Sequence, residues 1–194
     1  MPIRESPFPR AAMVRTLPGL CLRLTAAPAR HSDPGVPTTV LALPALRRRL
    51  ATLRRAGKRI VFTNGVFDLL HPGHLRYLRA ARRLGDVLVV GLNSDRSARR
   101  LAKGPDRPLV RERDRAEMLA GLEMVDYVSV FSQDTPYALI AAIAPDVLVK
   151  GGDWSVEQIV GADLVLARGG VVKSLRYAPG YSTTALLQRI RRSP

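Results

Sequence analysis

Two histidines separated by a proline and a glycine carry the most distinctive chemistry in this sequence. His71 and His74 close the stretch TNGVFDLLHPGH, residues 63–74. Pro72 suits the first turn of a helix, where its missing N–H costs no hydrogen bond. At a spacing of three residues, both imidazoles can face one side of that turn, beside its amide groups and the positive end of the helix dipole. Such a cluster of donors is suited to binding phosphate oxygens.

Two other interpretations of the histidine pair stay open at this point. The pair could bind a metal, but the chain has one cysteine and three histidines, and Asp68 alone would complete a poor set of ligands. The stretch could also be a packed turn without chemistry, which is common for a short motif. We favour phosphate binding and expect no metal ligands among the protein's side chains.

Short apolar runs alternate with helical patterns after residue 59, and these elements must position the histidines. The runs are apolar enough to be strands buried on both faces of a parallel sheet, and they cover 59–63, 86–93, 126–131, 146–150 and 171–175. Helical patterns lie around 73–84, 112–122, 135–143, 156–167 and 182–192. The alternation predicts an α/β fold with a doubly wound parallel sheet in a single domain. Ligands of such sheets bind beyond the carboxyl ends of the strands, where Gly65 lets the backbone approach a ligand.

The first 38 residues differ from the rest in composition. Prolines interrupt every apolar stretch, so this segment cannot bury enough surface to offset its ordering entropy, and we predict a disordered tail over 1–38. Leucines at 43, 46, 50 and 53 keep helical spacing and predict a lead-in helix within 39–58, which Gly57 would end. The α/β domain then occupies 59–194.

The net charge of +15, from 31 basic and 16 acidic residues, suggests nucleic-acid binding as one function class. The positive charge is spread over several segments, however, and no stacking aromatic residues are interleaved with it. We favour solvated, arginine-rich helix faces and expect no nucleic-acid partner. The lone Cys21 fits a reducing compartment, and no apolar run reaches about 18 residues, so we expect a cytoplasmic protein without a membrane span.

A series of motifs continues beyond the histidine pair. In order they are FTNGVFDLLHPGHLRYLRAARRLGDVLVVGLNSDRSARRLAKGPDRPLV, RAEMLAGLEMVDYVSVFSQDTPYALIAAIAPDVLVKGGDW, IVGA and GYSTT. From residue 59 to 190 they resemble the adenylyltransferases of bacterial ADP-heptose synthesis, in the HxGH nucleotidyltransferase superfamily that also contains the cytidylyltransferases. The resemblance implies a Rossmann-like nucleotidyltransferase fold for the domain at 59–194.

The resemblance also implies a reaction. D-glycero-β-D-manno-heptose 1-phosphate and ATP would give ADP-heptose and pyrophosphate, for lipopolysaccharide or a related glycoconjugate. The sugar phosphate already carries an oxygen nucleophile, so in-line attack on the α-phosphorus needs no serine or cysteine nucleophile. Mg²⁺ is implied as the companion of ATP, because it binds nucleotide phosphates and keeps most of its waters. The choice of ATP over CTP or GTP rests on the resemblance alone.

The family resemblance also suggests protein partners. The family resemblance implies a homodimer. Related bacterial enzymes often carry a fused sugar-kinase domain, which these 194 residues lack, so we expect a separate heptose kinase to supply the sugar phosphate.

The resemblance assigns roles to the first motif. His71 and His74 would be catalytic, contacting the triphosphate and stabilising the transition state. Asp68 has three interpretations, which the sequence leaves open: it could orient a donor, bind a sugar hydroxyl of the substrate, or cap local backbone. The nucleotide cradle would be formed by Thr63, Asn64, Gly65 and Phe67.

Two lysines and an aspartate follow from the same resemblance. Lys103, in the loop LAKGPDRP, would close on phosphate as a catalytic residue, and a solvated loop charge is the alternative. Lys150 and Gly151 would border the nucleotide at the end of the fourth strand. Asp153 would bind the sugar phosphate, although Gly-Gly-Asp also suits an ordinary turn after a strand. Trp154 replaces the tyrosine expected after that aspartate, which keeps an aromatic ring and loses a hydroxyl.

The turn GYSTT and one arginine complete the predicted site. Ser182 is a natural helix N-cap, and three hydroxyls in a row favour binding of nucleotide phosphates over plain capping. Arg115 resembles an arginine near the acceptor phosphate of related transferases, and a helix-surface arginine is the alternative. The three hydroxyls belong to Ser182, Thr183 and Thr184.

Two rival functions remain. The first motif hardly separates an adenylyltransferase from a cytidylyltransferase acting on glycerol 3-phosphate or a similar phosphate ester. The rival from another class is a basic, non-catalytic nucleic-acid-binding protein that uses a degenerate nucleotide fold.

Overall fold

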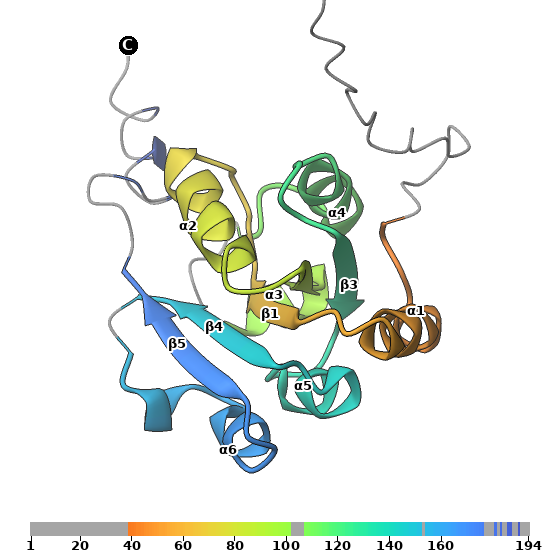
Figure 1. Cartoon of the computed structure of the whole chain (residues 1–194). Helices are drawn as coiled ribbons and strands as arrows, with labels where there is room; N and C mark the ends of the chain where they lie inside the picture. Colours follow the sequence, from red (N-terminus) through yellow and green to blue (C-terminus); the bar gives the residue numbers. More distant parts are fainter. Residues whose placement is uncertain are drawn as a thin grey trace, which may run out of the picture. The chain divides into compact units, whose positions relative to one another are not determined.

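A parallel sheet forms the centre of the domain (Figure 1). The computed structural model describes residues 39–101, 107–152 and 154–176, together with 181, 183, 186, 187 and 190. Within these residues the strand order is β3-β2-β1-β4-β5, and every neighbouring pair is parallel. The strands are β1 (Ile60–Gly65), β2 (Val87–Asn93), β3 (Tyr127–Phe131), β4 (Val147–Gly151) and β5 (Val171–Leu175). All five predicted strands are confirmed, and their ends agree with the structure to within two residues.

The described helices are α1 (Leu43–Arg55), α2 (Pro72–Arg82), α3 (Asp95–Arg100), α4 (Glu112–Ala120), α5 (Tyr137–Ile143) and α6 (Ala162–Leu166). The helix predicted around 156–167 is wrong in detail, because a 3-10 turn, Val156–Gln158, precedes a short α6. The sequence prediction also missed α3. Its six residues, DRSARR, contain no apolar repeat, and the Ser94 side chain caps its first turn by accepting from the Ser97 N–H.

Helices cover both faces of the sheet. The helices α2 and α4 lie on one face, and α1, α5 and α6 lie on the other (Figure 1). Strand residues alternate between the two resulting cores, so that Val61 packs with Leu78 of α2 while Phe62 packs with Leu50 of α1. Full burial of each large aliphatic side chain contributes about 1.5–3 kcal/mol relative to its exposure.

The strand order places a switch point between β1 and β4. The chain runs from β1 outward to β2 and β3, and then returns to build β4 and β5 on the other side of β1. Thr63 near the end of β1 pairs with Val149 near the end of β4. Because ligands of open parallel sheets bind beyond the carboxyl ends at such a switch point, this edge is the expected site.

The segment before β1 packs on the domain. Val40 forms a parallel bridge with Val128 of β3, where Leu41 N–H donates to the Val128 carbonyl at 2.9 Å. The buried leucines of α1, Leu46 and Leu50, belong to the core of the domain. The tail predicted for 1–38 lies outside the described residues.

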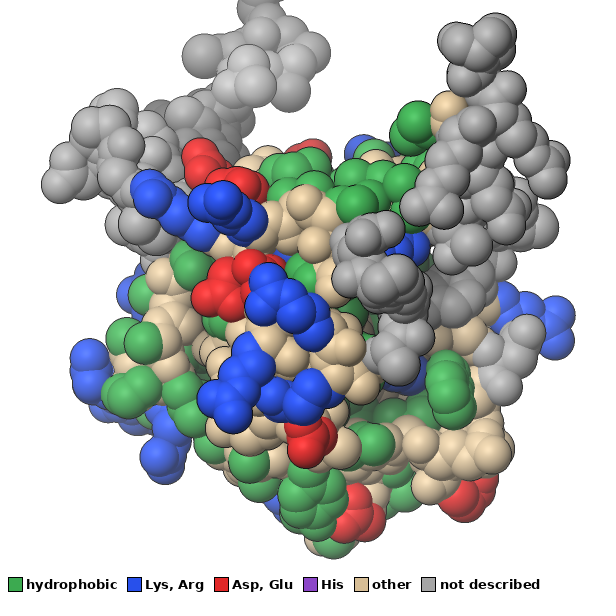
Figure 2. All heavy atoms as spheres, turned by 180° about the vertical axis from the view of Figure 1, so that it is seen from behind, with side chains coloured by type: hydrophobic (Ala, Val, Ile, Leu, Met, Phe, Trp, Pro, Cys, Tyr) green, Lys and Arg blue, Asp and Glu red, His purple; other side chains and the backbone are tan. Residues whose placement is uncertain are grey.

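Arginine side chains dominate parts of the surface. Figure 2 shows blue Lys and Arg side chains gathered near the middle of the face seen from behind, with red Asp and Glu side chains beside them. Ion pairs join Arg82 to Asp126 and Arg100 to Asp134. Part of the positive charge is thus paired with nearby carboxylates. Within the described ranges, every helix is too short or too polar to cross a membrane.

Candidate active site

The histidine pair lies at the amino end of α2, as the sequence predicted. His71 is the N-cap residue, and its Nδ1 accepts from the His74 N–H at 3.3 Å. Pro72 occupies the first turn. Because Nδ1 accepts, the neutral ring carries its proton on Nε2 and presents an N–H donor there. Burial lowers the pKa of His71, although its own backbone hydrogen bond raises it, so the neutral form is favoured.

The two imidazoles stack on each other. The ring centroids of His71 and His74 are 3.8 Å apart and the planes differ by 14°. The Phe67 ring lies 5.3 Å from the His74 ring, and the Tyr181 ring lies 6.3 Å from the His71 ring, measured between centroids. Arg76 extends over the Tyr181 ring, with its guanidinium carbon 5.1 Å from the ring centroid. Each histidine of the pair therefore has a further aromatic ring nearby.

Gly73 permits this packing. A β-carbon at Gly73 would lie 2.9 Å from His71 Nδ1, closer than real contacts allow, and 3.0 Å from the Tyr181 Cβ, which is a very tight contact. The glycine between the histidines therefore lets the His71 ring and Tyr181 close over the helix start. The structure thus brings Tyr181, of the predicted GYSTT turn, next to the first motif. In Figure 1 the helical piece near the carboxyl end of the chain, in dark blue, lies beside the beginning of α2.

Of the three predicted hydroxyl residues in this turn, only Thr183 belongs to the described part of the chain. It lies in a helical segment and is half-buried. Ser182 and Thr184 lie outside the described residues, so their predicted contacts with nucleotide phosphates stay predictions.

Gly65 and Phe67 form a compact turn after β1. Phe67 adopts a left-handed conformation with φ of 47°. Its ring packs over Gly65, where a β-carbon would lie 2.9 Å from Phe67 Cε2. The Phe67 ring also lies 5.3 Å from the His74 ring, so this turn lies beside the histidine pair, and Asn64 before it is half-buried.

Thr63 serves the fold through its side chain. Its hydroxyl is fully buried and lies 2.5 Å from the Tyr77 hydroxyl, which in turn donates to the Val149 carbonyl at 3.3 Å. These bonds join β1, α2 and β4 at the switch point. If Thr63 contacts the nucleotide as predicted, its backbone must make that contact, because its hydroxyl is buried. The sequence analysis missed Tyr77, although a tyrosine on the apolar face of a helix signals a buried hydroxyl that needs a partner.

The carboxylate of Asp68 accepts hydrogen bonds from other residues of the protein. Its side chain is only 6% exposed, and Oδ1 accepts from the Leu109 N–H at 2.8 Å and the Val110 N–H at 3.0 Å. Oδ2 pairs with Arg107 Nη1 at 2.6 Å. Of the interpretations left open, these contacts support capping of backbone, although the capped amides lie some 40 residues away in sequence. Both carboxylate oxygens thus already accept from protein donors, and the predicted contact of Asp68 with substrate stays a prediction.

Arg115 is the clearest correction. Both interpretations placed its guanidinium at a surface, but the residue is 1% exposed, because position 115 shares the inward face of α4 with Ala116 and Leu119. The guanidinium donates to three carbonyls and one carboxylate. The acceptors are Val110 O (2.8 Å), Val66 O (2.6 Å), Asn93 O (2.9 Å) and Asp95 Oδ1 (2.7 Å). Arg115 therefore ties the first motif to the end of β2 and cannot reach an acceptor phosphate.

The end of β2 adds residues that the sequence analysis did not single out. Asn93 is buried and donates through Nδ2 to Ser97 Oγ at 2.9 Å, and Ser97 Oγ donates to the Gln133 carbonyl at 2.8 Å. The run Asn-Ser-Asp directly after an apolar strand was the available signal, because polar residues there face the ligand edge of the sheet.

The end of β4 carries Lys150, which is half-buried, and Gly151, which is buried. Gly152 N–H donates to the Leu175 carbonyl at 2.9 Å, which holds the turn against β5. Trp154 follows with 48% of its surface exposed, and its backbone N–H donates to Ser174 Oγ at 3.3 Å. The predicted residues Lys103 and Asp153 lie outside the described residues.

Comparison with known proteins agrees with this architecture. The family model described as Cytidylyltransferase-like matches residues 62–189. "Bifunctional protein HldE" of Syntrophotalea carbinolica is 57% identical over 146 residues, which cover 75% of this chain and 30% of that protein. The protein of the same name from Geotalea uraniireducens is 49% identical over 161 residues, which cover 83% of this chain and 33% of the relative. The chain thus spans about a third of the length of these curated relatives.

A solved structure shows the same fold. The crystal structure of the lipopolysaccharide core biosynthesis protein from Thermoplasma volcanium superimposes with a TM-score of 0.52 at 30% identity, covering 63% of this chain and 98% of that one. The family match extends from β1 through the histidine motif to the final helical segment. On this evidence, the chain belongs to the cytidylyltransferase-like family of nucleotidyltransferases.

Proposed function

We propose that the protein transfers the adenylyl group of ATP to D-glycero-β-D-manno-heptose 1-phosphate, forming ADP-heptose and pyrophosphate. The observation that carries this proposal is the stacked pair of His71 and His74 at the amino end of α2, beside the switch point of the sheet. The relatives named HldE and the lipopolysaccharide core biosynthesis protein support the choice of a heptose substrate.

The chemistry follows from the donors at this edge. A phosphate oxygen of the sugar phosphate attacks the α-phosphorus, and the bond from that phosphorus to the bridging oxygen of pyrophosphate breaks. The Nε2–H of His71 and the Gly73 N–H, the first amide of α2 because Pro72 has none, donate to phosphate oxygens as charge moves onto the leaving group. Correct placement of both substrates contributes up to about 7–11 kcal/mol in ideal cases. No side chain forms a covalent intermediate in this scheme.

ATP enters with Mg²⁺ in this proposal. Two carboxylates at this edge of the sheet are already committed, because Asp68 pairs with Arg107 and Asp95 pairs with Arg115. The ion would be held mainly by phosphate oxygens and water, as suits Mg²⁺. When bound, it offsets negative charge on the phosphates.

The sugar phosphate must come from a kinase reaction. The relatives are named bifunctional, and the chain spans about a third of their length. We propose that a sugar kinase outside these 194 residues supplies the heptose 1-phosphate. A cytoplasmic location and a homodimer belong to the same proposal: the lone Cys21 suits a reducing compartment, and the dimer rests on the family resemblance.

Pyrophosphate release tests the proposal. The full chain is incubated with Mg²⁺ and each of ATP, CTP and GTP, together with heptose 1-phosphate or glycerol 3-phosphate. We expect release with ATP and heptose 1-phosphate, and a loss of about 10²–10³ in kcat for His71→Ala. Arg79→Ala, an exposed residue of α2 away from the stack, is the matched control and should keep full activity. Release with CTP and glycerol 3-phosphate alone would assign the rival cytidylyltransferase activity instead.

A further inference from the structure

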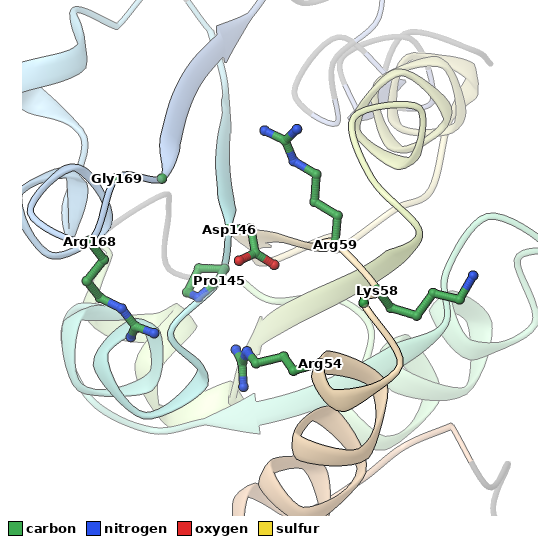
Figure 3. A pocket seen from close by; sticks show the side chains of 9 residues that line it. Arg54, Lys58, Arg59, Pro145, Asp146, Arg168 and Gly169 are labelled. Carbon is green, nitrogen blue, oxygen red and sulfur yellow. The ribbon is translucent and has the colours of Figure 1, made fainter.

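A second basic site lies at the opposite edge of the sheet, where the strands begin. A hollow of about 590 Å³ opens there, lined by residues around the ends of three helices and the starts of β1 and β5 (Figure 3). Its charged lining comprises four cations and one carboxylate, from Arg54, Lys58, Arg59, Arg168 and Asp146. A cavity of this size suits a small ligand. We propose that this hollow binds a doubly charged phosphate group, clamped between Arg54 and Arg168.

The two arginines approach the hollow from different helices. Arg54 lies in the last turn of α1, and Arg168 follows α6. In Figure 3 their guanidinium groups extend toward each other below Pro145 and Asp146, whereas Arg59 and Lys58 extend away from them. A tetrahedral anion between the two groups would receive charge-assisted N–H donors from both sides.

Arg54 is held in place before any ligand arrives. Its Nη2 donates to the carbonyls of Ile143 and Ala144, the latter at 2.7 Å. These are the last carbonyls of α5, so Arg54 also caps that helix. A fixed guanidinium loses little side-chain entropy on binding, which favours affinity.

Arg168 is held through its backbone. The turn after α6 is closed by hydrogen bonds from the Arg168 and Gly170 amides to the Val165 carbonyl, at 3.2 and 2.9 Å. Gly169 takes a left-handed conformation with φ of 74°, which a glycine adopts without strain. The side chain of Arg168 thus projects from an ordered turn.

An alternative role for these cations is to stabilise helix C-termini by interacting with the helix dipole. The helices α1, α5 and α6 all end at this edge. That role accounts for Arg54 but not for Arg168. Backbone amides, including Gly57 N–H to the Arg54 carbonyl and Gly169 N–H to the Leu166 carbonyl, already satisfy the ends of α1 and α6. Within the described ranges, Arg168 makes no ion pair and no side-chain hydrogen bond.

The charge balance of the hollow also favours an anion. Asp146 is partly committed, because its Oδ2 accepts from the Ile60 N–H at 2.7 Å. Lys58 pairs outside the clamp with Asp86, at 3.7 Å. Burial lowers the pKa of Arg54 most, Asp146 raises it, and the positive charge of Arg168 lowers it again. A phosphate group between the two arginines would remove this repulsion.

Such binding would have a structural consequence. The anion would join α1 to the segment after α6, and so fasten α1 to the rest of the domain. The strand β1 separates this clamp from the histidine site by about 20 Å, at roughly 3.3 Å per residue over its length. Ligand binding at the clamp would therefore not compete with a nucleotide, and the inference does not depend on the proposed function.

Titration with inorganic phosphate at constant ionic strength tests the clamp, with binding followed by amide chemical shifts. We expect the Gly169 and Gly170 amides to shift in the wild-type chain. Arg168→Gln should weaken the affinity about tenfold or more, because one charge-assisted interaction is lost. Arg168→Lys should recover part of it. Arg47→Gln, an exposed arginine on α1 outside the hollow, removes the same charge and should leave the affinity unchanged.

Two further arms separate this site from the histidine site and identify the source of the phosphate. His71→Ala should leave the phosphate titration of Gly169 and Gly170 unchanged. Tighter binding of pyrophosphate than of AMP identifies a free polyphosphate as the ligand, and the reverse identifies a phosphate ester. Equal affinity in wild type and Arg168→Gln, or an equal loss in Arg47→Gln, would overturn the inference.

Discussion

Arg115 Nη2 lies 2.7 Å from Asp95 Oδ1, in an ion pair that joins α4 to the first turn of α3. The arginine side chain is fully buried, whereas the aspartate keeps some contact with solvent. The same guanidinium holds the carbonyls of Val66 and Asn93, which follow β1 and end β2. One buried cation thus sets the spacing between the loop that leads to the histidines and the neighbouring strand.

Replacing Arg115 should therefore destabilise the whole domain. Arg115→Ala leaves Asp95 and three carbonyls without their donor, and loss of a buried ion-pair partner costs about 3–5 kcal/mol. Urea unfolding should show this as a lower midpoint. Arg113→Ala, an exposed neighbour on α4, should change stability by less than about 0.5 kcal/mol. An unchanged midpoint for Arg115→Ala, with only a raised KM for the sugar phosphate, would restore the surface role that the sequence suggested.

The stability of the protein should depend on pH through His71. Burial lowers the pKa of its imidazole, so the unfolded chain takes up a proton at a higher pH than the folded chain does. The contribution of His71 to stability is therefore complete above its ordinary pKa of about 6.5 and is lost as the pH falls toward the folded value. Protonation of Nδ1 also breaks the bond from the His74 N–H.

Urea unfolding at a series of pH values checks this sign. Between about pH 7 and pH 5.5, the free energy of unfolding should fall more for wild type than for His71→Asn, because the variant has no titrating group at position 71. Both proteins retain His74, which makes the comparison specific to position 71. A larger acid loss in the variant would contradict the lowered pKa.

Gly73→Ala should separate activity from stability. The added β-carbon would lie 2.9 Å from His71 Nδ1, so the imidazole must move from the stack. Alanine improves helix propensity by about 1 kcal/mol, which offsets part of the strain. We expect kcat to fall at least about tenfold, since a displaced donor no longer meets the phosphate.

The matched control for this change is Gly121→Ala at the end of α4. A β-carbon there meets only ordinary contacts, the nearest at 3.6 Å, so activity and unfolding midpoint should both stay close to wild type. If Gly73→Ala keeps full activity, the stacked orientation of His71 is not needed for catalysis.

Trp154 should report substrate binding by its fluorescence. It is the single tryptophan of the chain, it is 48% exposed, and it lies at the carboxyl ends of β4 and β5. Binding of ATP and sugar phosphate should cover the ring, which would shift its emission to shorter wavelength. Trp154→Ala should raise the KM for the sugar phosphate and change stability by less than about 0.5 kcal/mol, as expected for an exposed side chain. A spectrum unmoved by saturating substrates would place the substrates away from this turn.

Local patterns in the sequence determined the framework of this protein. The five apolar runs specified parallel strands, and β1, β2 and β4 are buried along most of their length, as expected of strands covered on both faces. The run His-Pro-Gly-His specified its own helix start, since Pro72 fits the first turn and His71 caps it. Residues within one helical turn make these contacts, so nearby sequence suffices to predict them.

Only the tertiary structure decided which polar side chains serve the fold. Asp68 and Arg115 looked like substrate ligands, yet all their partners except the Val110 carbonyl are 20 to 49 residues away in sequence. The approach of Tyr181 to His71 spans still more of the chain. A residue's type shows what it can bind, but its burial and its neighbours depend on how distant segments pack. Short-range periodicity contains no information about such contacts. The strands were therefore predicted well, whereas the buried hydrogen bonds and ion pairs of Asp68 and Arg115 were not.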